Sequence, residues 1–173
     1  RPIRVWCSAA SSGEEPYSIA ITVQEALGAN VSNVSIIASD LDTNVLETAR
    51  KGVYPIERVE KLSPERLRRF FLRGTGAQEG YVSVRPELKR MIDFQRINLL
   101  EPNWPVKGPL DIIFCRNVMI YFDKPTQYKI LSRFAPMMQP DGLMFAGHSE
   151  SFLHAADLFK SLGKTVYALA KAR

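Results

Sequence analysis

The hydrophobic positions of the chain form short runs of two kinds, and their alternation predicts an α/β fold. Short apolar runs rich in β-branched residues indicate buried strands, and between them apolar residues recur at helical spacing. Strands are predicted at 3–7, 34–39, 110–115, 143–146 and 165–169, with the alternation resuming at 91–100. Helices are predicted after the first strand, through 45–49, from Pro125 to Met138, and around 152–162.

Residues 51–90 interrupt this alternation. Ser63-Pro64-Glu65 predicts the start of a short basic helix, 73–80 is a glycine-rich turn, and 81–85 alternates like a strand with one polar face. We therefore predict a small, mostly antiparallel β subdomain at 51–90, inserted into a main α/β domain made of 1–50 and 91–173. Because a sheet edge accepts a further strand through backbone hydrogen bonds, the insert is expected to recognise a partner.

The segment joining the first strand to the first helix is the strongest candidate for binding a ligand. It contains small residues and Gly13, followed by Glu14, Glu15 and Pro16, and Pro16 suits the first helical turn. Small side chains let the backbone approach a ligand closely. In an open α/β sheet, the crevice beyond the carboxyl end of the first strand takes a nucleotide-like cofactor.

The charge of this segment narrows the choice of cofactor. A dinucleotide site usually carries G-x-G-x-x-G, so that free amides and the helix dipole hold a pyrophosphate. Here there is one glycine, and Glu14 and Glu15 stand where the phosphate would lie. Carboxylates repel phosphate and attract a cation such as S-adenosylmethionine, which carries ammonium and sulfonium groups. Alternatively, the two acids complement the helix dipole and nothing more.

Two acids follow the second predicted strand. An acid at this strand tip, about 20 residues beyond the glycine loop, is the usual partner of ribose hydroxyls. Either acid could instead cap the next helix. We predict that Asp40 binds the ribose and that Asp42 is the cap.

Composition indicates one soluble globular domain, with 173 residues, 46% hydrophobic and 24% charged. No apolar run reaches the roughly 20 residues of a membrane span. The chain opens close to a core strand without a signal segment, so we expect a further segment upstream. Cys7 and Cys115 lie in apolar runs, which predicts buried free thiols and a cytoplasmic location.

The net charge of +5, with a pI of about 9.3, admits nucleic acid, an anionic membrane or an acidic protein as partner. The Lys and Arg residues concentrate between Lys51 and Arg96 and are not interleaved with aromatic residues along one helix. A solvated basic face without a partner is the alternative.

Several motifs together carry a family resemblance. They are SSGEEPYS at 11–18, ASDLD at 38–42, INLL at 97–100, FCRNVMIYF at 114–122, PDG at 140–142 and GHSE at 147–150. Their order from Arg4 to Lys171 resembles that of the chemotaxis receptor methyltransferases, the CheR family. The resemblance implies a Rossmann-like S-adenosylmethionine-dependent methyltransferase fold with an inserted antiparallel β subdomain. It also implies an enzyme that methylates glutamate side chains on the cytoplasmic helices of chemoreceptors, leaving S-adenosylhomocysteine.

The resemblance also assigns roles by position. Glu15 would hold the methionyl amino group and Asp40 the ribose. Asn98 and Leu99 would lie beside the adenine, and Asn117 and Val118 in the methyl-donor pocket. Ser11 is a further implied cofactor residue. Tyr121 would lie near the transfer site, unless it is a core aromatic anchoring the next helix. Arg116 is expected to orient the substrate carboxylate or, equally, to pair with a structural acid.

The glycine-rich turn resembles that of family members which dock on a pentapeptide at a receptor's C-terminus. Arg73, Gly74, Gly76 and Gly80 match, whereas Ser83 occupies a position where such members usually have a second arginine. The family's N-terminal helical domain, which helps to close the donor pocket, is not among these residues. We therefore expect weak activity, or none, from this segment alone.

The chemistry of carboxyl methylation needs no general base, because a glutamate is already ionised at neutral pH. His148 follows a strand end and is expected to be a loop histidine with local hydrogen bonds, the alternative being contact with the active site, and His154 is expected at the surface. Neither cysteine has metal-ligand spacing, so no metal is predicted. A nucleic-acid methyltransferase is one alternative, although the Asn/Asp-Pro-Pro-Tyr-like segment of base-methylating enzymes is missing. A non-catalytic module that binds the cofactor product or a receptor tail is the other. We expect a monomer that neither binds nucleic acid nor inserts into a membrane.

Overall fold

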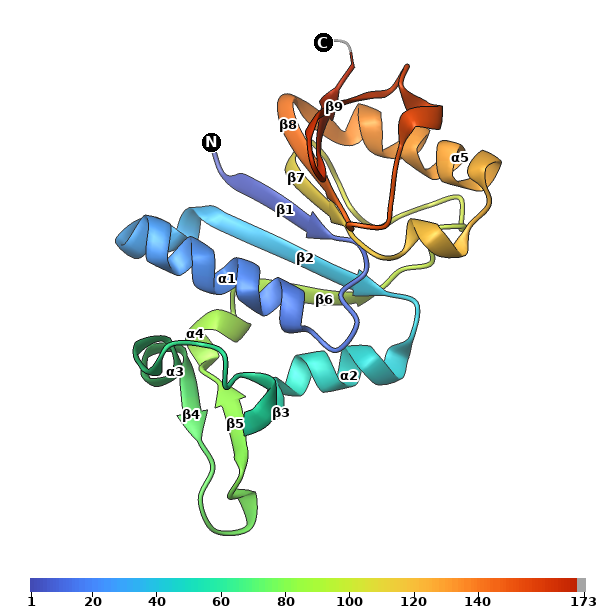
Figure 1. Ribbon diagram of the computed structural model, residues 1–173. Coiled ribbons are helices and arrows are strands. Elements are labelled where there is room, and N and C mark those ends of the chain that lie inside the picture. The colour runs from blue at the N-terminus through green and yellow to red at the C-terminus, as the bar shows by residue number, and fades with distance from the viewer. Residues whose placement is uncertain (171–173) are drawn as a thin grey trace.

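The computed structural model describes residues 1–170, and at positions 29 and 30 the backbone alone. Residues 171–173, the end of the predicted main domain, lie outside the described residues. In chain order the elements are β1 (Ile3–Cys7), α1 (Glu14–Leu27), β2 (Val34–Asp40), α2 (Thr43–Lys51), β3 (Val53–Pro55), α3 (Pro64–Phe70), β4 (Phe71–Arg73), β5 (Tyr81–Val84), α4 (Pro86–Lys89), β6 (Ile92–Arg96), β7 (Leu110–Cys115), α5 (Lys124–Phe134), β8 (Met138–Ala146), β9 (Phe159–Gly163) and β10 (Val166–Leu169) (Figure 1).

A seven-stranded sheet of order β6-β2-β1-β7-β8-β10-β9 forms the body of the protein. The strands from β6 to β8 are parallel, and β10 runs antiparallel to both of its neighbours. Val5 of β1 pairs with Ile36 of β2 on one side and Ile112 of β7 on the other. The chain order reverses at β1, so the carboxyl ends of β1 and β7 border the crevice where α/β proteins of this type bind ligands. The predicted α/β fold is confirmed.

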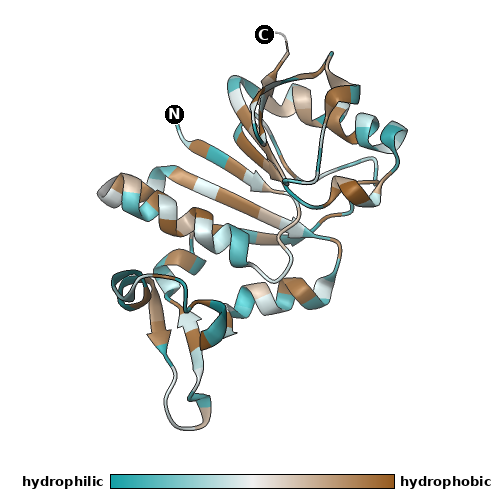
Figure 2. Ribbon diagram, in the orientation of Figure 1, coloured by the Kyte–Doolittle hydropathy of each residue, from teal (hydrophilic) through white to brown (hydrophobic). Residues whose placement is uncertain are grey.

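Alternate residues of β1 fill two hydrophobic cores, one on each face of the sheet. Trp6 is fully buried on the α5 face, where its ring lies edge-on to Phe134 at 5.3 Å between centroids. Val5 and Cys7 are buried on the α1 face. Figure 2 shows the hydrophobic residues concentrated along these central strands. Cys7 and Cys115 are both buried free thiols, as the sequence predicts.

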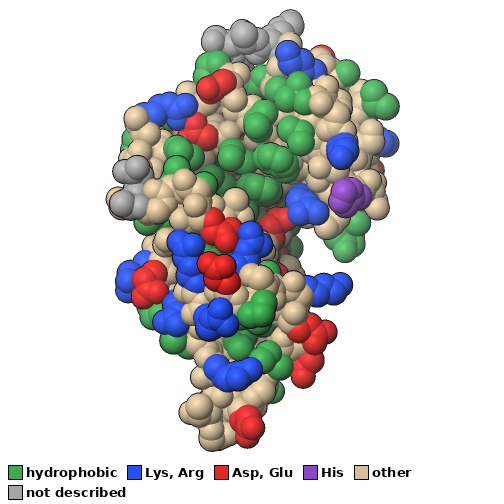
Figure 3. Space-filling view, turned by 60° about the vertical axis from the view of Figure 1, so that its left-hand side comes forward, with side chains coloured by type: hydrophobic (Ala, Val, Ile, Leu, Met, Phe, Trp, Pro, Cys, Tyr) green, Lys and Arg blue, Asp and Glu red, His purple; other side chains and the backbone are tan. Residues whose placement is uncertain are grey.

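Part of the α1 face of the sheet is left uncovered. Ile19 and Val23 of α1, with Ile112 and Phe114 of β7, line an apolar groove of about 450 Å³. Figure 3 shows hydrophobic side chains gathered on the upper part of the molecule and Lys and Arg side chains over the lower part.

None of the helices within residues 1–170 combines the length and the apolar character that crossing a membrane requires.

The segment between α2 and β6 forms a second, three-stranded antiparallel sheet of order β3-β5-β4. It projects from the body in Figure 1, with the β4–β5 loop at its tip. Ser63 caps α3 by accepting a hydrogen bond from the Arg66 amide at 3.2 Å. The small antiparallel sheet predicted for the insert is confirmed.

Two predicted helical segments are wrong. Residues 152–162 contain a single 3-10 turn at Leu153–Ala155 and then strand β9, because Lys160 and Ser161 pair with Ala168 and Tyr167 of β10. The helix predicted to reach Met138 ends at Phe134, and Met138 begins β8. Pro136 explains that boundary, since it has no amide hydrogen to continue the α-helical hydrogen bonds, and the chain goes on as the 3-10 turn Ala135–Met137.

Candidate active site

The loop between β1 and α1 needs glycine at one position for two reasons. Gly13, the residue before α1, has a φ of 100°, in the left-handed region that side-chain-bearing residues rarely adopt. A Cβ built there would lie 2.8 Å from the Ala49 Cβ and 2.8 Å from the Tyr54 hydroxyl oxygen. The loop therefore fits closely against α2 and β3.

Three backbone amides of this loop donate hydrogen bonds within the protein. The Ala10 amide donates to the Ser39 carbonyl at 2.8 Å, Ser11 donates to Asp40 Oδ2 at 2.9 Å, and Gly13 donates to the Ala10 carbonyl at 3.0 Å. A pyrophosphate site needs such amides free to point at the ligand. The loop geometry thus agrees with the charge argument against a dinucleotide.

An open cavity of about 610 Å³ lies where this loop meets the end of β2 and the segment after β7. It brings together most of the residues predicted for the site, namely Ser11, Glu15, Asp40, Arg116, Asn117, Val118 and Tyr121. Ala9, Ala10, Ser12 and Glu14 complete its lining. These side chains come from three segments that are far apart in the sequence.

Asn98 and Leu99 are not among the residues that line this cavity. Their segment does start beside it, because the Ile97 amide donates to the Asp40 carbonyl at 3.1 Å. Leu99 is buried in the core on the α5 face, and Asn98 Oδ1 accepts a hydrogen bond from the Leu100 amide at 2.9 Å. Their role beside an adenine stays a prediction.

The two acids after β2 have different partners. Asp42 caps α2, because its Oδ1 accepts a hydrogen bond from the Asn44 amide at 2.8 Å. Asp40 accepts from the Asp42 amide through Oδ1 at 3.0 Å and from Ser11 through Oδ2. These two bonds hold the Asp40 carboxylate at the edge of the cavity, and the predicted cap at Asp42 is confirmed.

Glu15 lies between a thiol and a guanidinium. Its Oε1 accepts from Cys7 Sγ at 3.1 Å, and its Oε2 pairs with Arg116 Nη1 at 3.1 Å. Burial raises the pKa of the Cys7 thiol well above its ordinary value, so the thiol keeps its proton and donates it. Arg116 thus pairs with an acid, and that acid lies in the cavity wall. Its action on a substrate carboxylate stays a prediction.

Glu150 fastens the segment after β7 and was not predicted from the sequence. Its Oε1 accepts from the amides of Asn117 and Gly147, and its Oε2 accepts from the Met119 amide, each at 2.8 Å. Asn117 has a φ of 62°, a conformation that costs a residue with a side chain some stability. The GHSE motif contains Glu150, but nothing in its spacing indicates that the carboxylate returns to residues 117–119.

Tyr121 ends the 3-10 turn Met119–Tyr121, and 78% of its surface is exposed. A core aromatic would be buried, so the structure excludes that alternative. The ring stands at the mouth of the cavity, where it is available to a ligand.

The two histidines differ from each other. His148 is exposed in the loop after β8, as predicted. His154, predicted at the surface, is half-buried, and both of its ring nitrogens are buried without a hydrogen-bond partner among the described residues. Its ring lies edge-on to Phe152, and burial lowers the pKa of His154 below its ordinary value.

The residues predicted to dock a peptide surround a second cavity in the insert, of about 620 Å³. Arg73, Gly74, Gly76 and Gly80 all line it. Gly74 is required by packing, because a Cβ there would lie 2.1 Å from the Gln78 carbonyl oxygen. Gly76 and Gly80 have φ values of 59° and 88°. Ser83 lies in the central strand β5, paired with Val53 and Leu72.

The fold is that of S-adenosylmethionine-dependent methyltransferases among solved structures. A TehB-like SAM-dependent methyltransferase from Corynebacterium glutamicum matches with a TM-score of 0.54 at 10% identity, over 98% of this chain and 79% of that one. PKMT2 from Rickettsia typhi, in complex with AdoHcy, matches with a TM-score of 0.51 at 14% identity, over 83% of this chain and 20% of that one.

The family is shown by sequence. The model described as CheR methyltransferase, SAM binding domain, matches residues 1–168, and the chain belongs to this family. It is 57% identical to chemotaxis protein methyltransferase 2 of Pseudomonas aeruginosa over 98% of this chain, and 56% identical to the chemotaxis protein methyltransferase of Salmonella typhimurium over 97%. The chain spans 61% and 58% of the lengths of these two relatives.

The cofactor of this family domain, S-adenosylmethionine, suits the donor set of the cavity. Glu15 and Asp40 offer carboxylates to an ammonium group and to hydroxyls, and both line the same cavity. The amides of Ala10, Ser11 and Gly13 are bonded within the protein and are not free for a phosphate. The residues present therefore fit a cationic nucleoside without phosphate.

Proposed function

We propose that the chain is the catalytic domain of an enzyme that methylates glutamate side chains on the cytoplasmic helices of chemoreceptors, in chemotactic adaptation. The observation that carries the proposal is its 57% identity, over nearly the whole chain, to a protein named as a chemotaxis methyltransferase. The cavity lined by Glu15, Asp40 and Tyr121 supports it, because it fits the cofactor and opens beside an exposed aromatic residue.

The reaction assigned to this site requires positioning more than proton transfer. When bound, S-adenosylmethionine supplies the methyl group, which a glutamate carboxylate accepts as the neutral thioether leaves. The carboxylate is ionised at neutral pH, since its reference pKa is about 4.3. The protein therefore needs to hold the two reactants in line and to limit water, and both effects favour a step in which opposite charges cancel.

Each cavity residue has a part in this proposal. Glu15 binds the amino group of the methionyl moiety and Asp40 the ribose hydroxyls. Asn117 and Val118 form the wall beside the methyl donor, in the conformation that Glu150 maintains. Tyr121 orients the incoming carboxylate from the mouth of the cavity, and Arg116 adds a positive charge that attracts it.

We further propose that the insert docks on the C-terminal pentapeptide of the receptor. Strand β4 is an edge of the three-stranded sheet, where an extended peptide can add through backbone hydrogen bonds. A groove of about 590 Å³ beside it has Leu67, Phe71 and Val82 in its lining and includes the basic side chains Arg68, Arg73 and Arg85. Such a groove suits a short peptide with apolar side chains and a terminal carboxylate.

The test is methyl transfer to a defined product. The protein is mixed with methyl-tritiated S-adenosylmethionine and a receptor cytoplasmic fragment, made with and without its last five residues, and the labelled fragment is then treated with mild alkali. We expect label to be released as methanol, because esters hydrolyse under these conditions, and less transfer to the shortened fragment.

The other outcomes separate the competing functions. Label that resists alkali would indicate N-methylation and contradict the glutamate substrate. No transfer despite S-adenosylhomocysteine binding would favour a non-catalytic module. Equal transfer to both fragments would contradict docking on the pentapeptide while leaving the methylation intact.

A further inference from the structure

The insert contacts the cofactor loop through a buried tyrosine. Tyr54 lies on β3, and its hydroxyl donates to the Ser12 carbonyl at 2.6 Å. The side chain is 3% exposed, and its hydrogen bond to Ser12 is partly buried. Burial raises the pKa of Tyr54, which therefore keeps its proton and remains a donor at neutral pH.

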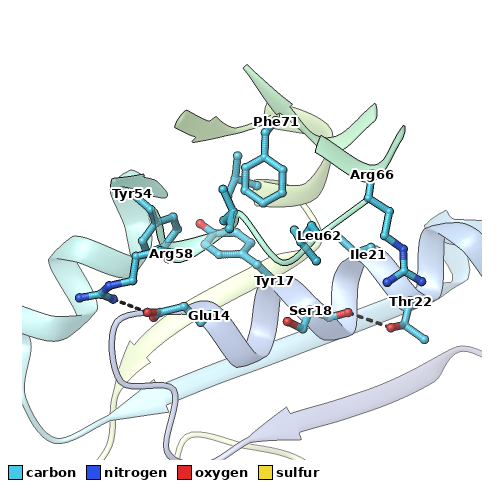
Figure 4. A pocket seen from close by; sticks show the side chains of 12 residues that line it. Glu14, Tyr17, Ser18, Ile21, Thr22, Tyr54, Arg58, Leu62, Arg66 and Phe71 are labelled. Atoms are coloured by element: carbon cyan, nitrogen blue, oxygen red, sulfur yellow. Dashed lines mark hydrogen bonds and ion pairs between the residues drawn. The ribbon is translucent and has the colours of Figure 1, made fainter. Parts of the chain in front are cut away.

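A second contact from the insert reaches the same part of the loop. Arg58 pairs with Glu14, and Glu14 in turn accepts a hydrogen bond from the Ser12 hydroxyl. Figure 4 shows Arg58 and Tyr54 on the insert side, with Glu14 at the start of α1 facing Arg58 across the gap. The Arg58–Glu14 pair is about half exposed, so its contribution is the smaller one.

The loop packs closely against Tyr54. Gly13 follows the carbonyl that Tyr54 binds, and the space for a side chain on Gly13 is filled by the Tyr54 hydroxyl and by Ala49. On the other side, the neighbouring Ser11 and Ser12 line the cofactor cavity. A displacement of Ser12 therefore changes the shape of the cavity wall.

We infer that Tyr54 is a positioning residue that holds the cofactor loop from the insert, so that the three-stranded sheet takes part in cofactor binding as well as in docking. This inference rests on the proposed function in that the cavity takes S-adenosylmethionine. The residue acts through Ser12, and it lies outside the cavity lining.

The chain contains a closely matched control for Tyr54. Tyr17 is also 3% exposed, and its hydroxyl donates to a backbone carbonyl, that of Ala49, at the same distance of 2.6 Å. The two rings lie edge-on with centroids 6.4 Å apart. Removing either hydroxyl leaves one carbonyl without its donor, a partly buried one for Tyr54 and a buried one for Tyr17, but only the carbonyl bound by Tyr54 belongs to the cofactor loop.

The experiment compares Tyr54→Phe with Tyr17→Phe by calorimetric binding of S-adenosylhomocysteine, thermal unfolding, and amide hydrogen exchange of residues 9–13. We expect similar decreases in melting temperature for the two variants. Affinity should fall about threefold to tenfold in Tyr54→Phe alone, with faster exchange of the loop amides. Arg58→Met should weaken binding less than Tyr54→Phe.

Unchanged affinity in Tyr54→Phe, or an equal loss in Tyr17→Phe, would overturn the inference and leave the proposed function standing. If the wild-type protein itself does not bind S-adenosylhomocysteine, the proposed function fails. The exchange comparison still decides whether Tyr54 holds the loop in that case.

Discussion

The carboxylate of Glu150 accepts a hydrogen bond of 2.8 Å from the backbone amide of Asn117, which lies 33 residues earlier in the sequence. The same carboxylate accepts hydrogen bonds from the amides of Gly147 and Met119, so one side chain joins the loop after β8 to the loop after β7. Asn117 is in left-handed backbone conformation, and Glu150 offsets the cost of that conformation with charge-assisted hydrogen bonds.

We expect Glu150→Gln to destabilise both the fold and the cofactor site. The substituted amide group has one acceptor oxygen and presents an NH₂ group to a backbone donor, so at least one amide loses its partner. The free energy of unfolding should fall by about 2 kcal/mol, the scale for a hydrogen bond to a charged group. Urea unfolding and S-adenosylhomocysteine binding measure the two effects. The exposed Glu101→Gln is the control, and an equal effect there would contradict the role of Glu150.

Asp40→Asn should weaken binding of S-adenosylhomocysteine about tenfold or more. A neutral amide loses the charged acceptor offered to the ribose hydroxyls, and 1.4 kcal/mol corresponds to a factor of ten in affinity. Asp42→Ala, two residues further on, removes the cap of α2 and should cost about 1 kcal/mol of stability. Calorimetric titration measures the affinity of Asp40→Asn, and urea unfolding measures the stability of Asp42→Ala. Full affinity in Asp40→Asn would remove Asp40 from the site.

The glycines of the β4–β5 turn should differ in their tolerance of alanine. Gly74→Ala places a Cβ 2.1 Å from the Gln78 carbonyl oxygen, so the turn must rearrange. Gly76→Ala meets no atom within 4 Å and costs about 1–2 kcal/mol through its left-handed backbone alone. We expect Gly74→Ala to reduce binding of a receptor fragment more strongly, measured by fluorescence anisotropy. Equal losses would show that the turn shape is not what the partner recognises.

Stability should fall as the pH decreases below about 6.5, in part because of His154. Burial of its ring and the nearby Lys124 lower its pKa in the folded state below the ordinary value of 6.5. His154 therefore binds a proton more tightly in the unfolded chain than in the folded chain, and protonation favours unfolding. Above pH 6.5 both states are neutral at this residue, and the effect disappears.

His154→Phe should flatten the pH dependence of the urea midpoint between pH 7 and 5.5. The exposed His148→Gln is the matched control and should leave that dependence unchanged. If the two variants behave alike, the pH dependence arises from other groups.

The amino-acid sequence determined the central strands, the cap at Asp42 and most residues of the cavity, for reasons that act locally. An apolar run such as 110–115 is compatible with a buried strand wherever it packs, and Asp42 can cap a helix with an amide two residues away. The small residues and the acids of the loop at 8–16 specify a close approach and a charge, whatever surrounds them.

The tertiary structure alone decided the features that depend on distant partners. The apolar residues of 152–162 fit helical spacing, yet 159–163 is a strand because β10 lies alongside to accept its hydrogen bonds. The contacts of Glu150 with Asn117, of Arg116 with Glu15, and of Tyr54 with Ser12 join residues 33, 101 and 42 positions apart. The residues next to a polar side chain in the sequence do not indicate which distant residue will be its partner in the folded chain.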